Sequence, residues 1–258
     1  TQLAFESPES NAIVANGNTL TLENTILKGA GNNNDWEIAL FCGGINGYNY
    51  ANLPTARTNG SIIVKGDCRI GNIYAGNLTH KDAQESDFAG TAQIRIESTV
   101  DFPDEANVTI YGCGGKESMG EGFGDVIYPG ANDSLVTGTV QVSLYDNLVK
   151  QVSGYGQNMH VTYNGGDYLQ TPILQNISSL SVESGKLQLA EGSSFCETNA
   201  NVTLTKDAQL HLNLLQDVTI GNFVGGGELV LGVEQKLAIT GSAAGSTRVY
   251  TGGINYYQ

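Results

Sequence analysis

The chain has little proline, little cysteine and few charged side chains. Its 258 residues include 5 prolines, 4 cysteines and 1 tryptophan, and charged residues make up only 15% of it. Basic residues are the scarcest charges, because 12 Lys and Arg stand against 26 Asp and Glu, for a formal net charge of -14. Binding to a phosphate backbone needs Lys and Arg gathered on one face. We therefore expect no nucleic-acid partner, and we attribute the acidic surface to solubility.

Long apolar runs are missing as well. No stretch approaches the roughly 18 to 20 apolar residues that cross a bilayer, so we expect no membrane insertion within this chain. The sequence begins at Thr1 without a Met and ends abruptly in INYYQ. We expect it to be a piece of a longer parent protein that carries further domains.

The 4 cysteines are too few to form a disulfide scaffold. Cys42 and Cys113 occupy similar turn contexts, FCGG and YGCGG, and we expect them to be buried thiols in neighbouring coils. A bridge between the two stays open as an alternative. Cys68 and Cys196 are expected in the core. The lack of CxxC motifs and of His/Cys clusters predicts no zinc site.

Helical periodicity is absent, and alternation of apolar and polar residues takes its place. Most of the alternating segments are short and bounded by Gly, Asn, Asp or Ser, as is typical of strands between tight turns. The strand candidates before the C-terminal part are 13–15, 19–22, 38–41, 61–65, 70–74, 93–96, 108–111, 139–144 and 160–163. This pattern predicts an all-β protein.

Apolar triplets recur at near-constant offsets in the C-terminal part of the chain. Leu180/Val182 return as Val202/Leu204 at an offset of 22, and a second offset of 27 relates Val202/Leu204 to Leu229/Leu231. At closely similar spacings, Leu187/Leu189 precede Leu210/Leu212, which precede Leu237/Ile239, and Phe223 precedes Tyr250. A repeat of this length, made of short alternating segments, indicates a solenoid. We predict a right-handed parallel β-helix of roughly 8 to 11 coils.

The prediction is one domain over residues 1–258, with irregular coils at 1–175 and regular coils at 176–258. The irregular part holds polar, glycine-rich insertions, which we expect to project from one side of the solenoid. The buried ladder positions are predicted to include Leu204, Leu212, Ile220, Leu231 and Ile239.

Aromatic residues followed by glycine turns form a second recurrence, at Phe41, Tyr74, Tyr111, Tyr163, Phe223 and Tyr250. Glycine suits corners where the backbone needs positive φ or where coils approach closely. We expect the aromatic rings at these corners to stack on one another from coil to coil.

The strings GNTLTLENTILKG, GNIYAGN, IYGCGG, VYTGG and SGKLQLAEGSSF resemble the right-handed parallel β-helix regions of bacterial cell-surface and adhesin-like proteins. These regions share the pectin-lyase-like architecture. The resemblance spans nearly the whole chain and implies an exported protein that displays a surface or binds glycans. It brings no catalytic signature with it.

An enzyme of this architecture needs a base or a carboxylate pair beside a groove. The strings typical of the hydrolases are absent, and His80, His160 and His211 each stand alone. The alternation of LHL points His211 outward, which predicts a solvated strand histidine. Arg69 and Arg95 are outward strand positions, read more simply as surface arginines. No catalytic residue is therefore assigned.

Acidic residues cluster at 82–87, 101–105 and 117–125, but none of these clusters follows a calcium-loop pattern. We therefore assign no metal ligands and no cofactor, with Ca²⁺ left open.

Aromatic and amide residues near the N-terminus give the candidate ligand-binding site. Trp36 follows the polar run 32–35, and Tyr48, Asn49 and Tyr50 lie in the first insertion. Aromatic faces beside amide side chains suit stacking on a sugar ring and hydrogen bonding to its hydroxyls. The alternative is that Trp36 and the tyrosines cover the N-terminal end of the core.

The leading hypothesis is a non-enzymatic, extracellular or cell-surface module. It would bind glycans or host surface proteins, or act as a rigid spacer. The alternative is a carbohydrate-active enzyme, either a polysaccharide lyase or a glycoside hydrolase. A third idea, ice binding through Thr19/Thr21 and Thr203/Thr205, is weak because these pairs lie far apart in the sequence.

Overall fold

The computed structural model describes residues 2–4, 12–28, 38–47, 59–98, 108–119, 125–130, 134–145, 149–155, 158–196 and 200–252. Within these ranges the chain forms strands joined by turns and contains no helix. Accordingly, no described segment is a helix long and apolar enough to span a membrane.

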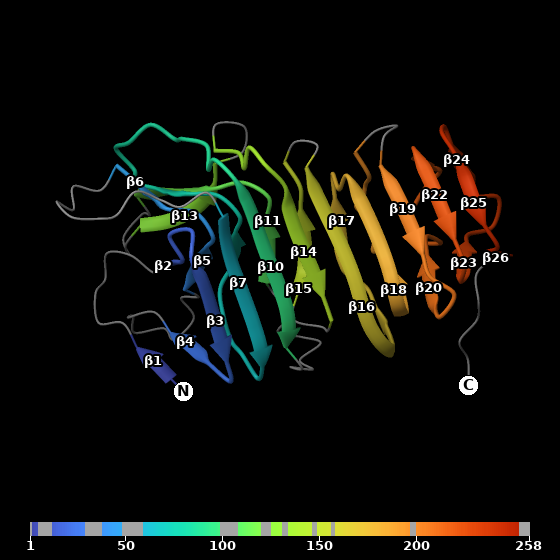
Figure 1. Cartoon of the computed structure of the whole chain (residues 1–258), viewed down its shortest axis with the longest axis horizontal. Helices are drawn as coiled ribbons and strands as arrows, with labels where there is room; N and C mark the ends of the chain where they lie inside the picture. Colours follow the sequence, from blue (N-terminus) through green and yellow to red (C-terminus); the bar gives the residue numbers. More distant parts are fainter. Residues whose placement is uncertain are drawn as a thin grey trace.

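The largest sheet holds 12 strands, nine of which lie side by side in the order of the sequence. These nine are β3 (Thr19–Glu23), β7 (Asn59–Gly66), β10 (Thr91–Ser98), β14 (Val140–Leu144), β16 (Met159–Gln170), β18 (Ser179–Gln188), β19 (Asn201–Leu204), β22 (Asn222–Gly225) and β25 (Ala243–Gly245). A branch from β18 adds β20 (Ala208–His211), β23 (Glu228–Leu231) and β26 (Arg248–Thr251). Figure 1 shows these strands following one another along the long axis from the N-terminus to the C-terminus.

The other sheets form the remaining sides of the coil. A six-stranded sheet consists of β2 (Ala12–Val14), β5 (Ala39–Phe41), β8 (Ile73–Tyr74), β11 (Val108–Tyr111), β15 (Val149–Ser153) and β17 (Ile173–Gln175). Two pairs are β1 (Gln2–Ala4) with β4 (Ile26–Lys28) and β21 (Val218–Ile220) with β24 (Leu237–Ile239). A four-stranded sheet consists of β6 (Ile45–Asn46), β9 (Leu78–Thr79), β12 (Gly115–Met119) and β13 (Asp125–Pro129).

Parallel pairing dominates, and among the strands that the structure describes only β12 and β13 pair antiparallel. Parallel sheets whose strands follow the sequence order are typical of a parallel β-helix, so the predicted fold class is confirmed. Strands from the polar, glycine-rich insertions at 43–59, 77–90 and 114–131 pair in one sheet, in which β9 joins β6 to β12 and β12 joins β13. This sheet lies at the N-terminal end of the molecule (Figure 1).

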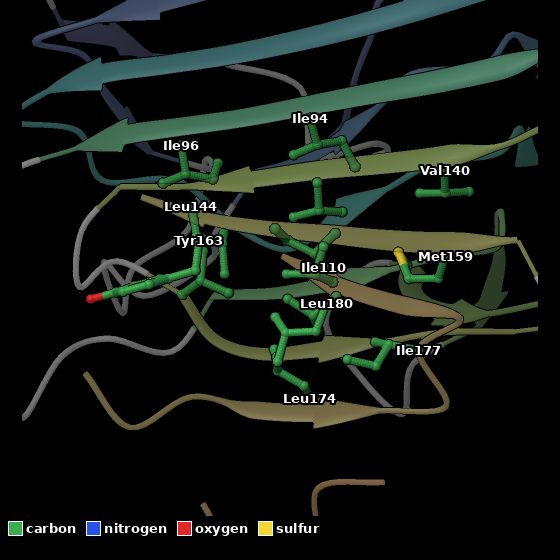
Figure 2. Packing of buried hydrophobic residues seen from close by; sticks show 14 of the residues in the cluster. Ile94, Ile96, Ile110, Val140, Leu144, Met159, Tyr163, Leu174, Ile177 and Leu180 are labelled. Carbon is green, nitrogen blue, oxygen red and sulfur yellow. The ribbon is translucent and has the colours of Figure 1, made fainter. Parts of the chain in front are cut away.

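Apolar side chains stack in rows through the interior. Val182 pairs with Tyr163 on one side and with Leu204 on the other, and all three are buried. Figure 2 shows the same arrangement near the middle of the solenoid, where Ile94 and Ile96 on one wall and Ile110 and Leu174 on another extend into a shared core. Of the predicted ladder positions, Leu204, Leu212, Ile220 and Leu231 are buried, and Ile239 in the last coil is half-buried.

The coil length differs from the one predicted. Leu180 pairs with Val202, and Leu187 pairs with Leu210, so the predicted offset of 22 and the closely similar spacing of the second pair are confirmed. The offset of 27 is wrong, because Val202 pairs with Phe223 rather than with Leu229.

The partner of Leu229 is Leu210, and the partners of Leu237 and Tyr250 are Val218 and Val230. These pairings correspond to coils of about 20 residues, at the short end of the range for solenoid repeats. The error has a physical cause: all faces of the coil carry the same alternating pattern, so a strand on one face matches a strand on another equally well.

Coil length also changes along the chain. Leu20 pairs with Ile62, which pairs with Ile94, which pairs with Val142, so the offsets between successive partners there are 42, 32 and 48. Val142 pairs with Val161 at an offset of only 19, and later coils keep close to that spacing. The longer N-terminal coils contain the insertions.

Aromatic stacking occurs on the outer side of the six-stranded sheet. Phe41 and Tyr74 have ring centroids 4.7 Å apart at 7°, and Tyr74 and Tyr111 have centroids 4.9 Å apart at 21°. The prediction of stacked corner aromatics is therefore confirmed for these three residues. Tyr163 and Phe223 lie instead in interior rows of the largest sheet.

The cysteines are all free thiols, and Cys42, Cys68 and Cys113 are buried, whereas Cys196 is half-buried. Burial raises the pKa of the Cys42 thiol well above its ordinary value, which disfavours the reactive thiolate. Cys42 and Cys113 do not lie in neighbouring coils. Cys42 follows Phe41 and Cys113 lies shortly after Tyr111, and both Phe41 and Tyr111 pair with Tyr74, whose coil lies between theirs.

We expect Leu204→Asp to lower the free energy of unfolding by at least about 4 kcal/mol, because it places an unpaired carboxylate in the apolar row beside Val182. Thr203→Asp is the matched control, since Thr203 faces outward on the same strand. Urea unfolding followed by circular dichroism measures both variants. Equal decreases in the free energy of unfolding of the two variants would contradict the placement of Leu204 in an interior row.

Candidate functional site

The predicted ligand-binding residues Trp36, Tyr48, Asn49 and Tyr50 lie outside the described residues. The other residues considered from the sequence are dispersed. Arg95 forms an ion pair with Glu97 and lies 4.9 Å from the ring of Tyr145, as a surface arginine does. Among the described residues, no group of three or more His, Cys, Asp or Glu is placed to hold a metal ion.

A groove of about 680 Å³ lies between the turn that follows β18 and the segment that joins β20 to β21. We call it the Phe195 groove. Its apolar lining comes from Phe195, Leu214 and Leu215, and Leu214 is 48% exposed. Its polar lining consists of Glu191, Ser193, Ser194, Gln216, Asp217 and Thr219.

The first segment of the groove is held by hydrogen bonds to the preceding coil. The hydroxyl of Ser193 accepts a hydrogen bond from the amide of Leu174 at 3.0 Å, and that of Ser194 accepts one from the amide of Asn176 at 3.1 Å. Phe195 forms a parallel β-bridge with Ile177 and packs against the core. Both serines therefore fix the backbone, and the exposed Glu191 is the other polar residue of this segment that lines the groove.

The second segment is held by the following coil. The side-chain amide of Gln235 donates hydrogen bonds to the carbonyls of Leu212, Leu215 and Gln216, at 2.8, 3.0 and 2.8 Å. The carboxylate of Asp217 accepts a hydrogen bond from the amide of Lys236 at 2.9 Å. Both sides of the groove are therefore part of the stacked wall, which gives a preformed shape.

A hydrogen-bonded network covers the outer face of β20, β23 and β26. Its centre is Glu228, which accepts hydrogen bonds from Gln209 at 2.8 Å, from Arg248 at 2.9 Å and from Tyr250 at 3.3 Å. The ring of His211 lies 3.4 Å from the side-chain oxygen of Gln209. We call these five residues the Glu228 network.

His211 differs from the prediction of a solvated histidine, because it is only 2% exposed. The alternation did place it on the outer face, but the side chains around it in the Glu228 network exclude water from it. Burial lowers the pKa of His211, the positive charge of Lys186 lowers it further, and the charge of Glu228 opposes this shift. Burial therefore favours the neutral form of His211 over the charged form.

The outer face of the largest sheet carries rows of hydroxyl and amide side chains. One row runs through Ser143, Thr162, Ser181 and Thr203, which occupy equivalent positions on successive strands. Thr21 belongs to the same row, but Ile63 and Arg95 separate it from the others. The two threonine pairs considered for ice binding thus share one sheet but do not form a continuous threonine array.

Comparison with protein-family models, with curated proteins and with solved structures found no match to this chain. The fold defines its class as a β-solenoid of stacked parallel strands. The Phe195 groove and the Glu228 network were both missed from the sequence. The network depends on the pairing of β20 with β23, which the repeat assigned wrongly, and nothing in the repeat indicated that the turns after β18 and β20 leave a groove between them.

The lowered pKa of His211 predicts a pH-dependent stability. The unfolded chain takes up this proton near the ordinary pKa of about 6.5, whereas the folded chain does so only at lower pH. Stability from this group is therefore complete above about pH 6.5 and is lost as the pH falls toward the folded pKa. We expect His211→Gln to weaken the pH dependence of the urea midpoint between about pH 7.5 and about pH 5.

His80→Gln is the control, because it removes a histidine from a loop outside the network. If the pH dependence of the urea midpoint is unchanged in His211→Gln, the lowered pKa of His211 does not contribute to stability.

Proposed function

We propose that this chain is a non-catalytic, exported surface module that binds carbohydrate in the Phe195 groove. The observation that carries the proposal is the composition of the groove, in which an apolar patch with an aromatic ring is bordered by carboxylate, amide and hydroxyl groups. Sugars present both apolar ring faces and hydroxyls, so a site of this kind matches their chemistry. The resemblance to bacterial adhesin-like β-helix regions supports the same function.

Preorganisation supports the proposal further. Hydrogen bonds from the preceding and following coils hold both sides of the groove, so a ligand does not have to order them on binding. Gln216 and Glu191 are exposed beside the apolar patch, where they are placed to accept or donate hydrogen bonds to sugar hydroxyls.

Removing the exposed apolar surface of the groove tests the proposal. We expect Leu214→Ser to lower the affinity for glycans that the wild-type chain captures on a glycan array by about tenfold, because about 1.4 kcal/mol of apolar contact is lost. Val224→Ser is a matched control: Val224 is 50% exposed, Leu214 is 48% exposed, and Val224 lies outside the groove.

Equal affinities of the two variants for such glycans would place binding elsewhere. Failure of the wild-type chain to bind any glycan or mucin would leave only the spacer role.

A carbohydrate-active enzyme is a second candidate, favoured by one observation. Glu191 and Asp217 line the same groove, one from each of its two segments. Glycoside hydrolases use two carboxylates on opposite sides of the scissile bond, one as acid and one as base or nucleophile.

The two candidates differ in what Glu191→Gln should do. A hydrolase would lose at least about a hundredfold in the release of reducing ends from a polysaccharide panel. A binding module releases none before or after the substitution and keeps its glycan affinity within a few-fold. Reducing-end assays with the wild-type chain and Glu191→Gln decide between them, and wild-type turnover would overturn the non-catalytic proposal.

A further inference from the structure

A second hollow lies beside the Glu228 network, at the other end of β20 from the Phe195 groove. Its volume is about 510 Å³, within the range of small-molecule sites. The charged residues that line it are Lys206, Glu228 and Arg248. Two cations and one carboxylate leave it with an excess of positive charge, in a chain whose formal net charge is -14.

More positive charge lies next to this hollow. Lys186, Gln209, Glu228 and Arg248 occupy equivalent positions on four successive strands, so Lys186 belongs to the same outer row. Lys186 also lowers the pKa of the neighbouring His211 more than Glu228 raises it. Of the 12 basic residues in the chain, 3 therefore gather on this face.

Arg248 is oriented by an ion pair with Glu228. Its Nη1 donates to Glu228 at 2.9 Å, while its side chain stays 75% exposed. A guanidinium has five N–H donors in a planar fork, so the bond to Glu228 orients the group and leaves donors directed away from that carboxylate. Glu228 in turn is fixed by Gln209 and Tyr250. Preorganisation of this kind lowers the entropic cost of binding an anion.

Gly226 and Gly227 line the hollow, and close packing between coils requires glycine at position 227. A Cβ at Gly227 would lie 2.2 Å from the carbonyl oxygen of Ala208 and 2.3 Å from that of Thr205. Both are backbone atoms that cannot move aside, so only glycine fits. Gly226 also lines the hollow, together with Lys206 and Arg248.

We propose that this hollow binds one anionic group, a carboxylate or a sulfate ester, carried on a pyranose sugar. The excess of a single positive charge in the lining matches a monoanion, and the fork of Arg248 matches two oxygens of either group. The sugar part of the ligand rests on the proposed function, whereas the anion rests on Lys206, Glu228 and Arg248 alone. The chain would thus select charged over neutral glycans.

Three sugars with the same ring test the inference: glucose, glucuronate and glucose 6-sulfate, which differ only in the group at carbon 6. We expect glucuronate or glucose 6-sulfate to bind the wild-type chain with a Kd on the order of 1 mM at low salt, and glucose to bind at least tenfold more weakly. Backbone amide shifts in NMR titrations should localise to Gly226, Gly227 and Arg248. The two charged arms show which anion is preferred.

Substitutions distinguish binding in this hollow from a general attraction of anions to the basic residues of the chain. Arg248→Gln and Lys206→Gln should each weaken binding of the charged sugar about tenfold. Glu228→Gln keeps an acceptor for Arg248 but removes the competing charge, so it should tighten binding a few-fold. Lys150→Gln is the matched control, because it removes an exposed cation from β15, far along the chain from the hollow.

Equal binding of glucose and the charged sugars, or equal weakening in Lys150→Gln and Lys206→Gln, would overturn the inference. Absence of binding by either charged sugar at about 50 mM would overturn it as well. Leu214→Ser should leave this binding unchanged, so a failure of the Phe195 groove to bind glycans is distinguishable from a failure of this site.

Discussion

The backbone hydrogen bond between one coil and the next is the interaction on which the rest of this structure depends. Inside the parallel sheets, a strand pairs with the strand one coil earlier and with the strand one coil later, which brings residues of equivalent position into contact. An apolar residue at an interior position is therefore covered from both sides by apolar residues, as Val182 is by Tyr163 and Leu204. Cohesion along the solenoid is a sum of contacts between neighbours. Turns are stacked by the same rule, and both hollows are spaces between stacked turns.

Much of the fold could be predicted from the sequence, for a reason visible in single residues. Alternation in segments such as the one holding Leu180 and Val182 indicates strands, and the return of the pattern at Val202 and Leu204 indicates a coil. The next coil could not be placed, because the segment holding Leu229 has the same alternation while lying on another face. Alternation reveals which side of a strand faces inward. It does not reveal which side of the coil a strand belongs to.

The sites were harder to predict because they depend on which turns and strands of adjacent coils lie next to each other. His211 was correctly placed on the outer face, but its burial follows from side chains of adjacent coils. Phe195 and Leu214 are distant in the sequence and border one groove because their turns are adjacent in the stack. Glu228 and Arg248 meet because their strands pair. The burial of His211 and the contact of Glu228 with Arg248 require the register of the last coils, which the repeat assigned wrongly. The Phe195 groove follows from the shapes of two turns, which alternation does not encode.

The ring column of Phe41, Tyr74 and Tyr111 lies outside the solenoid core and spans three coils. Its two phenols are near enough for their electronic transitions to couple, and burial raises the pKa of Tyr74 so that this phenol stays un-ionised in moderately alkaline solution. The chain thereby carries an intrinsic chromophore pair whose exciton signal in the near ultraviolet depends on the vertical alignment of adjacent levels. Slippage of one level against the next would be optically visible without any label.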